Sequence, residues 1–117
     1  MHEQSLVRQL LRQVQTIAEE YPTCQVKSIR VRVGEFSGVE PELLANAYSL
    51  LVADTSFEKA QLVVNRARLE AVCGLCESDF RIKRFTFQCP NCGSRELSIV
   101  GGEELLLESI AMEEPAL

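Results

Sequence analysis

Two pairs of cysteines, each enclosing two residues, are the feature of this sequence that most clearly indicates chemistry. Cys73 and Cys76 form the first pair and Cys89 and Cys92 the second, with twelve residues between the pairs. Each turn offers two sulfur ligands, and a hairpin between the turns would bring the four thiolates together around one tetrahedral ion. Because four thiolates leave no coordination position for water, this spacing predicts a structural zinc site and not a catalytic one.

Two other uses of the four sulfurs stay open. Two disulfides would need an oxidising compartment, whereas an odd total of five cysteines and the lack of a leader-like apolar stretch after His2 favour a reducing one. Iron held by the same sulfurs, as in rubredoxin-like electron carriers, is the second alternative. Between the pairs, Arg81, Lys83 and Arg84 either offset the negative charge of the metal centre or form a solvated face. Cys24 is interpreted as a small hydrophobic residue with no ligand role.

The first three residues combine donors that suit a second metal ion. The α-amine of Met1, the amide that follows it and the imidazole of His2 can close small adjacent chelate rings, with a fourth donor from the amide of Glu3 or from a carboxylate. Square-planar nitrogen coordination of this kind suits Ni(II) or Cu(II). The triplet is a weak signal by itself, because chain termini are usually frayed. Its context strengthens it, since the chain's only histidine stands immediately before a helix.

Glu40 is a further candidate for this second site. It precedes Pro41 at the expected start of a helix, yet glutamate is not among the favoured N-cap residues. Its carboxylate could therefore contact the metal or orient the His2 imidazole, as outer carboxylates often do. The alternative is a solvent-facing acid that is stabilised by the positive end of the helix dipole.

Apolar periodicity predicts the elements that position these residues. Three- and four-residue steps indicate amphipathic helices, and alternation with β-branched residues indicates strands. The helices are expected over Glu3 to Tyr21 and Pro41 to Ala53, and the strands over Lys27 to Glu35, Gln61 to Val72 and Glu104 to Met112. The pattern predicts an α+β fold with two helices packed on a small sheet of about three strands.

The cysteine segment, residues 73–102, is expected to be a zinc-ribbon insertion in that fold. About thirty residues cannot bury enough surface to fold alone, so the metal would replace a core. The strands at its two ends would be neighbours in one sheet, and the insert could rock on Ala71-Val72 and Gly101-Gly102. This gives one lobe of residues 1–72 plus 103–117 and a second lobe of residues 73–102.

Composition and charge exclude several classes of function. With 117 residues, of which 46% are hydrophobic, one domain with a small appendage is expected. No apolar run approaches the ~20 residues that span a bilayer, so we expect a cytoplasmic protein without a membrane partner. A net charge of -5 argues against nucleic acid, and the zinc segment is nearly balanced, with four basic and three acidic residues. The single histidine, at position 2, argues against Ser-His-Asp catalysis.

Three motifs follow one another along the chain: Met1-His2-Glu3 followed by Ser5, the stretch Val33-Gly34-Glu35-Phe36-Ser37, and the paired cysteines. With these motifs in this order, the chain resembles over its full length the HypA/HybF family of hydrogenase maturation factors, which are nickel metallochaperones. Glu40 stands where some members have aspartate, which keeps the carboxylate.

The resemblance implies a two-lobed metal-transfer protein without catalysis of its own. Met1, His2 and Glu3 would be the nickel site, and the four cysteines a structural zinc site. Nickel would pass to the large subunit of [NiFe]-hydrogenase together with a partner GTPase, and in some organisms urease also depends on this transfer. We expect a monomer or a weak homodimer. A nucleic-acid-binding zinc ribbon and a rubredoxin-like electron carrier are the competing interpretations.

Overall fold

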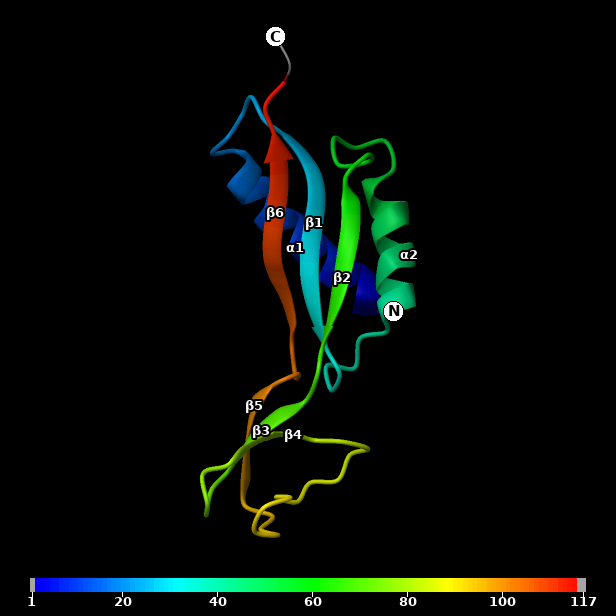
Figure 1. The fold of residues 1–117 in the computed structure, drawn as a ribbon. Helices are drawn as coiled ribbons and strands as arrows, with labels where there is room; N and C mark the ends of the chain where they lie inside the picture. The colour runs from blue at the N-terminus through cyan, green and yellow to red at the C-terminus, as the bar shows by residue number, and fades with distance from the viewer. Residues whose placement is uncertain (1, 116–117) are drawn as a thin grey trace.

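The computed structural model describes residues 2–115 of the chain. The molecule is elongated, with principal extents of 60 × 30 × 18 Å, and two small sheets follow one another along its long axis (Figure 1). The α+β fold with two helices is confirmed. In chain order the elements are α1 (His2–Ala18), β1 (Gln25–Gly34), α2 (Pro41–Val52), β2 (Gln61–Ala67), β3 (Glu70–Cys73), β4 (Asp79–Arg81), β5 (Leu97–Gly101) and β6 (Leu105–Glu113).

The first sheet has the strand order β2-β1-β6, with β1 parallel to β2 and antiparallel to β6. On the central strand β1, Ile29, Val31 and Val33 are buried, whereas Arg30 and Arg32 between them are exposed. The buried side chains join those of α1 and α2 in one core, so both helices cover the same face of the sheet. The opposite face carries the exposed arginines. The ranges predicted for β1, α2 and β6 agree with the structure to within two residues at each end.

The first helix ends earlier than its apolar spacing predicts. The apolar stripe continues to Tyr21, but α1 ends at Ala18 and the Tyr21 side chain is 52% exposed. The amide of Glu20 donates to the carbonyl of Ile17 at 3.1 Å. The amide of Tyr21 donates to the carbonyl of Ala18 at 3.0 Å, so the residues after the helix form turns of the 3₁₀ type. The cause is Pro22, which disfavours the helical conformation of the residue before it.

The segment predicted as one strand, Gln61 to Val72, is two strands in different sheets. β2 pairs with β1, whereas β3 lies in a second sheet of order β4-β3-β5. Leu69 between them is completely buried and forms a separate small core with Ala71 and Ile82. The prediction of one strand is wrong because a favourable β pattern does not say which sheet a residue joins. Leu69 is buried in the core of the second sheet, so the chain leaves the first sheet at this point.

The connections between the two sheets also differ from the expected ones. Ala71-Val72 and Gly101 lie within strands, so the connections are residues 68–69 and 102–104. Strands β2 and β6, at the two ends of the insert, are not neighbours, because β1 lies between them. The residues that follow β1 form hydrogen bonds to both connections. The amide of Glu35 donates to the carbonyl of Ala67, and the amide of Phe36 donates to the carbonyl of Gly102, each at 2.7 Å.

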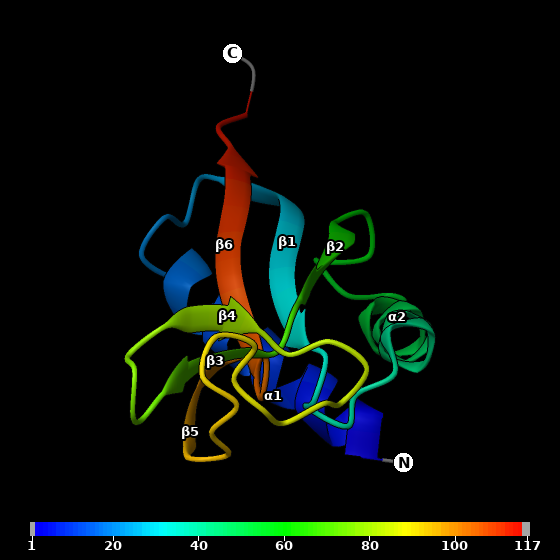
Figure 2. The same ribbon diagram turned by 60° about the horizontal axis from the view of Figure 1, so that its bottom comes forward.

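Phe36 adds an aromatic contact between the two sheets. Its ring centroid lies 5.7 Å from that of Phe85 and 6.0 Å from that of Phe87, both in the loop between β4 and β5. Figure 2, which brings this end of the molecule forward, shows that loop across the turn that follows β1. The turn after β1 therefore contacts the second lobe through both its backbone and its aromatic side chain.

Replacing Gly102 by alanine is expected to destabilise this junction. Gly102 has a φ of 92°, and a Cβ there would lie 2.5 Å from the carbonyl oxygen of Arg68 and 2.6 Å from the Cα of Leu69. The left-handed backbone and the overlap together should lower the free energy of unfolding by about 2–4 kcal/mol. Urea denaturation measures this. Gly38→Ala is the control, because its φ is 77° and nothing lies within 4 Å, so it should lose only about 1 kcal/mol. Equal losses would contradict the close packing at Gly102.

Candidate metal centres

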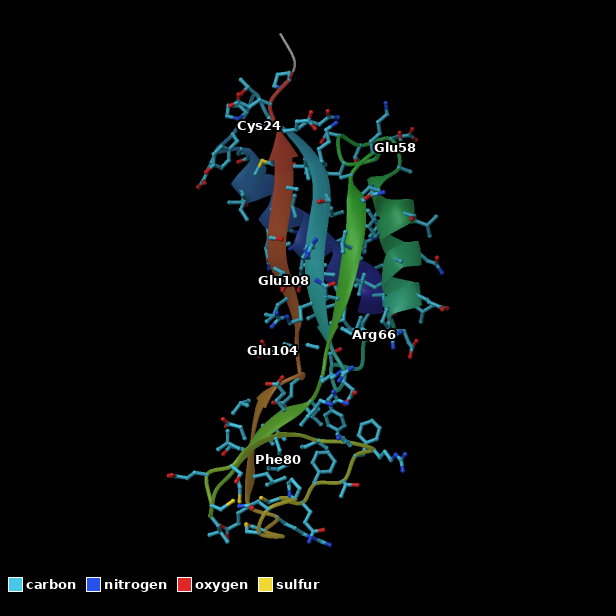
Figure 3. All side chains as sticks on the ribbon, viewed as in Figure 1. Cys24, Glu58, Arg66, Phe80, Glu104 and Glu108 are labelled. Atoms are coloured by element: carbon cyan, nitrogen blue, oxygen red, sulfur yellow. The ribbon has the colours of Figure 1, made fainter. Side chains whose placement is uncertain are left out.

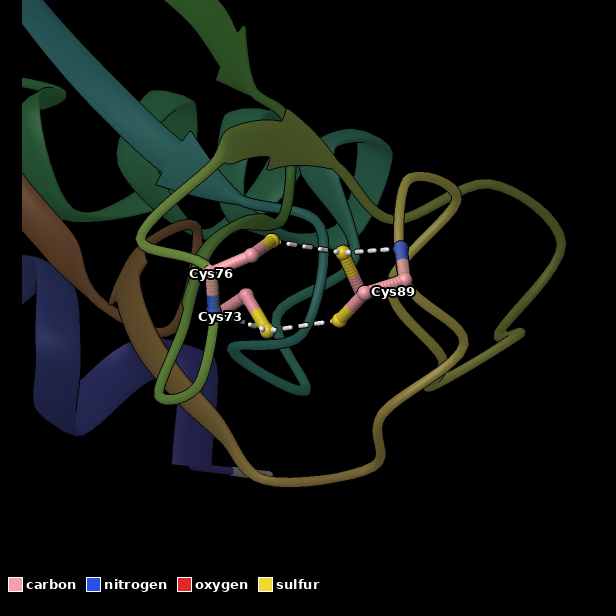
Figure 4. A group of neighbouring side chains, drawn as sticks. Cys73, Cys76 and Cys89 are labelled. Atoms are coloured by element: carbon pink, nitrogen blue, oxygen red, sulfur yellow. Dashed lines mark hydrogen bonds between the residues drawn. The ribbon is translucent and has the colours of Figure 1, made fainter.

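The four paired cysteines meet at the end of the second sheet. Cys73 ends β3, Cys76 follows in the next turn, and Cys89 and Cys92 belong to the turn before β5. Their four Sγ atoms all lie within 4.8 Å of one another. The closest contacts cross between the turns, at 3.5 Å for Cys73 with Cys92 and 3.5 Å for Cys76 with Cys89 (Figure 4). All the cysteines are free thiols, so none of them forms a disulfide.

The first cysteine of each pair is surrounded by backbone amides in the same way. The amides of Leu75 and Cys76 lie 3.4 and 3.5 Å from the Cys73 sulfur. In the second turn the amides of residues 91 and 92 lie 3.4 Å from the Cys89 sulfur. Amide dipoles that point at sulfur stabilise the thiolate, and they lower the pKa of Cys73, the amide of Cys76 having the largest effect. The first cysteine of each turn therefore has amide donors that favour the thiolate, the form that binds metal, whereas contact with Cys73 raises the pKa of Cys92 to about 12.

The sulfur arrangement fits a tetrahedral metal ion. With zinc–sulfur bonds of about 2.3 Å, the sulfurs of a regular tetrahedron lie about 3.8 Å apart. The four Sγ atoms are already gathered to near this spacing. The donor set of four sulfurs suits zinc and also iron. The cluster thus meets the geometric requirement of the metal site that the cysteine spacing predicts.

Two polar residues at this cluster were not identified by the sequence reasoning. Ser78 Oγ lies 3.1 Å from the sulfur of Cys76, and the Asn91 amide lies 3.5 Å from the same sulfur. These contacts lower the pKa of Cys76 to about 5, Ser78 having the larger effect. A signal was present in the sequence, because a serine follows the first cysteine of each pair at the same distance, Ser78 after Cys73 and Ser94 after Cys89.

The basic residues between the pairs, Arg81, Lys83 and Arg84, are exposed. Within residues 2–115 no described hydrogen bond or ion pair joins them to a sulfur. This arrangement favours the interpretation of a solvated face. The fifth thiol, Cys24, is partly buried at the opposite end of the molecule (Figure 3), which agrees with its exclusion from the ligand set.

At the other candidate site, Met1 lies outside the described residues, while His2 and Glu3 form the first turn of α1. The His2 side chain is 60% exposed, and its Nδ1 lies 3.9 Å from a carboxylate oxygen of Glu3. Glu3 is buried, with 7% exposure, and within residues 2–115 no other charged side chain is buried. An exposed imidazole therefore lies beside a fixed carboxylate.

Glu40 is the N-cap of α2 and makes no side-chain hydrogen bond to cap the helix. Its side chain is exposed. The first turns of α1 and α2 lie at the same end of the first lobe, the end that faces the second sheet (Figure 1). Among the described residues no recorded contact joins Glu40 to His2 or Glu3, so its part in a metal site stays a prediction.

Comparison with known proteins decides between the families that such a site allows. The family model described as "Hydrogenase/urease nickel incorporation, metallochaperone, hypA" matches residues 1–112. The chain belongs to the HypA family. HypA of Nitrosospira multiformis is 38% identical over 112 residues, which cover 96% of this chain and 97% of that protein. HypA of Aquifex aeolicus is 34% identical over 113 residues, which cover 97% and 98%.

The fold is that of solved HypA structures. The solution structure of the Ni metallochaperone HypA from Helicobacter pylori superposes with a TM-score of 0.71 at 24% identity, covering 98% of this chain and all of that one. A second HypA solution structure gives 0.75, also at 24% identity, and covers 97% of each chain. The HypA family is one of metallochaperones that serve hydrogenase and urease, so the predicted family is confirmed. No helix within residues 2–115 is long and apolar enough to cross a membrane.

Proposed function

We propose that this HypA chain binds one Ni(II) ion at its N-terminus and delivers it to [NiFe]-hydrogenase during maturation. The ligands would be the terminal amine of Met1, the imidazole of His2 and a donor from Glu3, with Glu40 as a further ligand or an orienting group. The observation that carries the proposal is the buried carboxylate of Glu3 beside the exposed imidazole of His2 at the start of α1.

A nickel carrier must hold its ion firmly enough to carry it and loosely enough to release it. Carboxylates are rarely buried, and a buried one at the first turn of a helix is stabilised by the helix dipole. The buried Glu3 carboxylate would therefore hold a bound ion in one position. The His2 side chain is 60% exposed, so a receiving protein could reach that ion. Release can use protons, because a metal ion binds the deprotonated form of an imidazole or an amine and protons compete with it for the same lone pair.

The four cysteines are proposed to hold a structural zinc ion. The small core of Leu69, Ala71 and Ile82 cannot by itself stabilise the fold of this lobe. The free energy of zinc binding would supply the missing stability. The nickel lobe would comprise residues 1–72 plus 103–117 and the zinc lobe residues 73–102, although the second sheet already begins at Glu70. A rubredoxin-like iron centre uses the same donor set, and a colourless protein with one zinc per chain would exclude it.

The family supports a proposal about the kind of partner. Maturation requires contact with other components of the pathway, and we propose that these are a nickel-handling GTPase and the hydrogenase large subunit. Urease is proposed as a second client in some organisms, because the family model describes nickel incorporation into both hydrogenase and urease. No catalytic step is assigned to this chain, and no nucleic-acid partner is proposed, because the net charge is -5.

Complementation tests the delivery function. In a hydrogenase-producing bacterium that lacks its own HypA, the native chain should restore hydrogenase activity in nickel-limited medium. A His2→Ala chain at equal abundance should restore less than about a tenth, because a ligand is worth at least as much as the outer partners whose loss costs ~10- to 100-fold. Excess nickel in the medium should reduce the difference. Full restoration by His2→Ala in limiting nickel would contradict the proposal.

A further inference from the structure

The two cysteine turns are local repeats of one another. In each, the amide of the first cysteine donates to a serine carbonyl five residues later, at 3.0 Å for Cys73 with Ser78 and 2.8 Å for Cys89 with Ser94. The residue before that serine has left-handed φ in both turns, 62° and 78°. Cys76 in the first turn and Cys92 in the second thus occupy equivalent positions, and any difference between their surroundings comes from side chains.

The side chains give Cys76 donors that Cys92 lacks. Ser78 Oγ is 3.1 Å from the Cys76 sulfur, so its hydroxyl can donate to the Cys76 thiolate. The Asn91 amide reaches across from the second turn, 3.5 Å from that sulfur and 3.3 Å from Ser78 Oγ. The amide thus supports the hydroxyl as well as the sulfur, and hydrogen bonds linked in this way strengthen one another.

The equivalent residues of the second turn do not make the corresponding contacts with the Cys92 sulfur. Ser94 matches Ser78, but its hydroxyl accepts a hydrogen bond from the backbone of Glu96 at 3.0 Å. Leu75 matches Asn91, and its side chain has no polar atom. Among the described residues, the N–H donor recorded for the Cys92 sulfur is the backbone amide of Ser94.

The four cysteines also differ in solvent exposure. Cys92 is exposed, Cys76 is intermediate, and Cys73 and Cys89 are buried. The modification of cysteines follows solvent access and the nucleophilicity of the thiolate, which falls when the thiolate accepts hydrogen bonds. With zinc bound all four sulfurs are thiolates, so access and hydrogen bonding decide which one reacts, and both single out Cys92.

We propose that Cys92 is the reactive sulfur of the cluster and a modification site for carbon electrophiles, while Ser78 and Asn91 protect Cys76. With iodoacetamide, the Cys92 thiolate donates its electron pair to the methylene carbon, the carbon–sulfur bond forms, and the carbon–iodine bond breaks to release iodide. The product is a thioether, a neutral and weaker ligand. The inference rests on the proposed zinc occupancy, so zinc content is measured before the reaction and separates failure of the two proposals.

Limited alkylation of the zinc-loaded full chain tests the order of reaction. Trypsin places the two pairs in separate peptides, residues 69–81 and 85–95, and fragmentation distinguishes Cys89 from Cys92. Under single-hit conditions Cys92 should carry at least about ten times more label than Cys76, a ratio within reach of one charge-assisted hydrogen bond. Equal labelling of the four cysteines overturns the proposal. So does labelling of all four in step with zinc loss.

Three variants separate the shielding contacts from general loosening of the turn. Ser78→Ala and Asn91→Leu should each raise the labelling of Cys76 about tenfold and leave that of Cys92 unchanged. Ser94→Ala is the matched control, because its hydroxyl contacts the Glu96 amide, and it should leave Cys76 labelling as in the native chain. If Ser94→Ala raises Cys76 labelling as much as Ser78→Ala does, the shielding role is wrong. Far-UV circular dichroism and zinc content confirm that each variant is folded and loaded.

Discussion

Replacing Cys89 by serine is expected to unfold the second sheet while the first sheet stays folded. The second core contains three buried side chains, Leu69, Ala71 and Ile82, which is too little apolar surface to hold about thirty residues. Structural zinc supplies on the order of 10–16 kcal/mol in small peptides, and one missing thiolate would remove much of that. The ¹H–¹⁵N correlation spectrum should lose dispersion for β3 to β5 and keep it for β1.

The control for this variant is Cys24→Ser. Cys24 is partly buried at the far end of the molecule and belongs to the first lobe (Figure 3), so its loss should leave zinc content and both sets of resonances in place. A Cys89→Ser chain that keeps one zinc per chain, or keeps a dispersed spectrum for β3 to β5 after chelator treatment, would show that the metal does not stabilise this lobe.

Replacing His2 by alanine is expected to weaken Ni(II) binding by at least about 100-fold, because the imidazole closes one of the chelate rings and even outer-shell partners are worth ~10- to 100-fold. The fold should not change, since the side chain is 60% exposed and contributes nothing to the core. Isothermal titration calorimetry of the zinc-loaded protein measures the affinity, and the thermal midpoint should match that of the native chain.

Gln4→Ala is the matched control for His2→Ala. Gln4 is exposed in the same first turn of α1, so the substitution changes the helix start without removing a proposed ligand. Its nickel affinity should equal that of the native chain. If both variants lose affinity equally, the effect comes from fraying of the helix and the assignment of His2 as a ligand is wrong.

Sequence patterns correctly predicted the features that depend on neighbouring residues in the chain. Pro41 begins α2 as expected, because proline suits the first helical position and its missing amide has no partner there. The alternation of Ile29, Val31 and Val33 predicted β1, and the cysteine spacing predicted a cluster whose sulfurs the fold does gather. In each case neighbours within a few residues carry the information.

What local patterns missed depends on contacts between distant segments. The break at Leu69 requires a second core, which forms only when Ile82 folds back against it. The backbone of Gly102 packs on that of Arg68, and no periodicity reveals such an approach. The contact of Asn91 with Cys76 crosses from one turn to the other, so it depends on how the turns face each other.

The nickel assignment stands apart, because its central group is the terminal amine and Met1 lies outside the described residues. Spacing suggested Met1, His2 and Glu3 together, and the described part of the chain adds that Glu3 is buried while His2 is exposed. That arrangement suits an ion that is held at one side and open at the other. This arrangement supports the proposed nickel site.

The most direct test of the account is a nickel titration of the native chain beside the Nα-acetylated chain, both with one zinc bound. Acetylation keeps every side chain and removes only the basic amine. The account predicts that the native chain binds one Ni(II) and that acetylation weakens the binding by at least about 100-fold. Equal affinities and stoichiometries for the two proteins would show that the terminal amine is not a ligand, and would contradict the proposed nickel site.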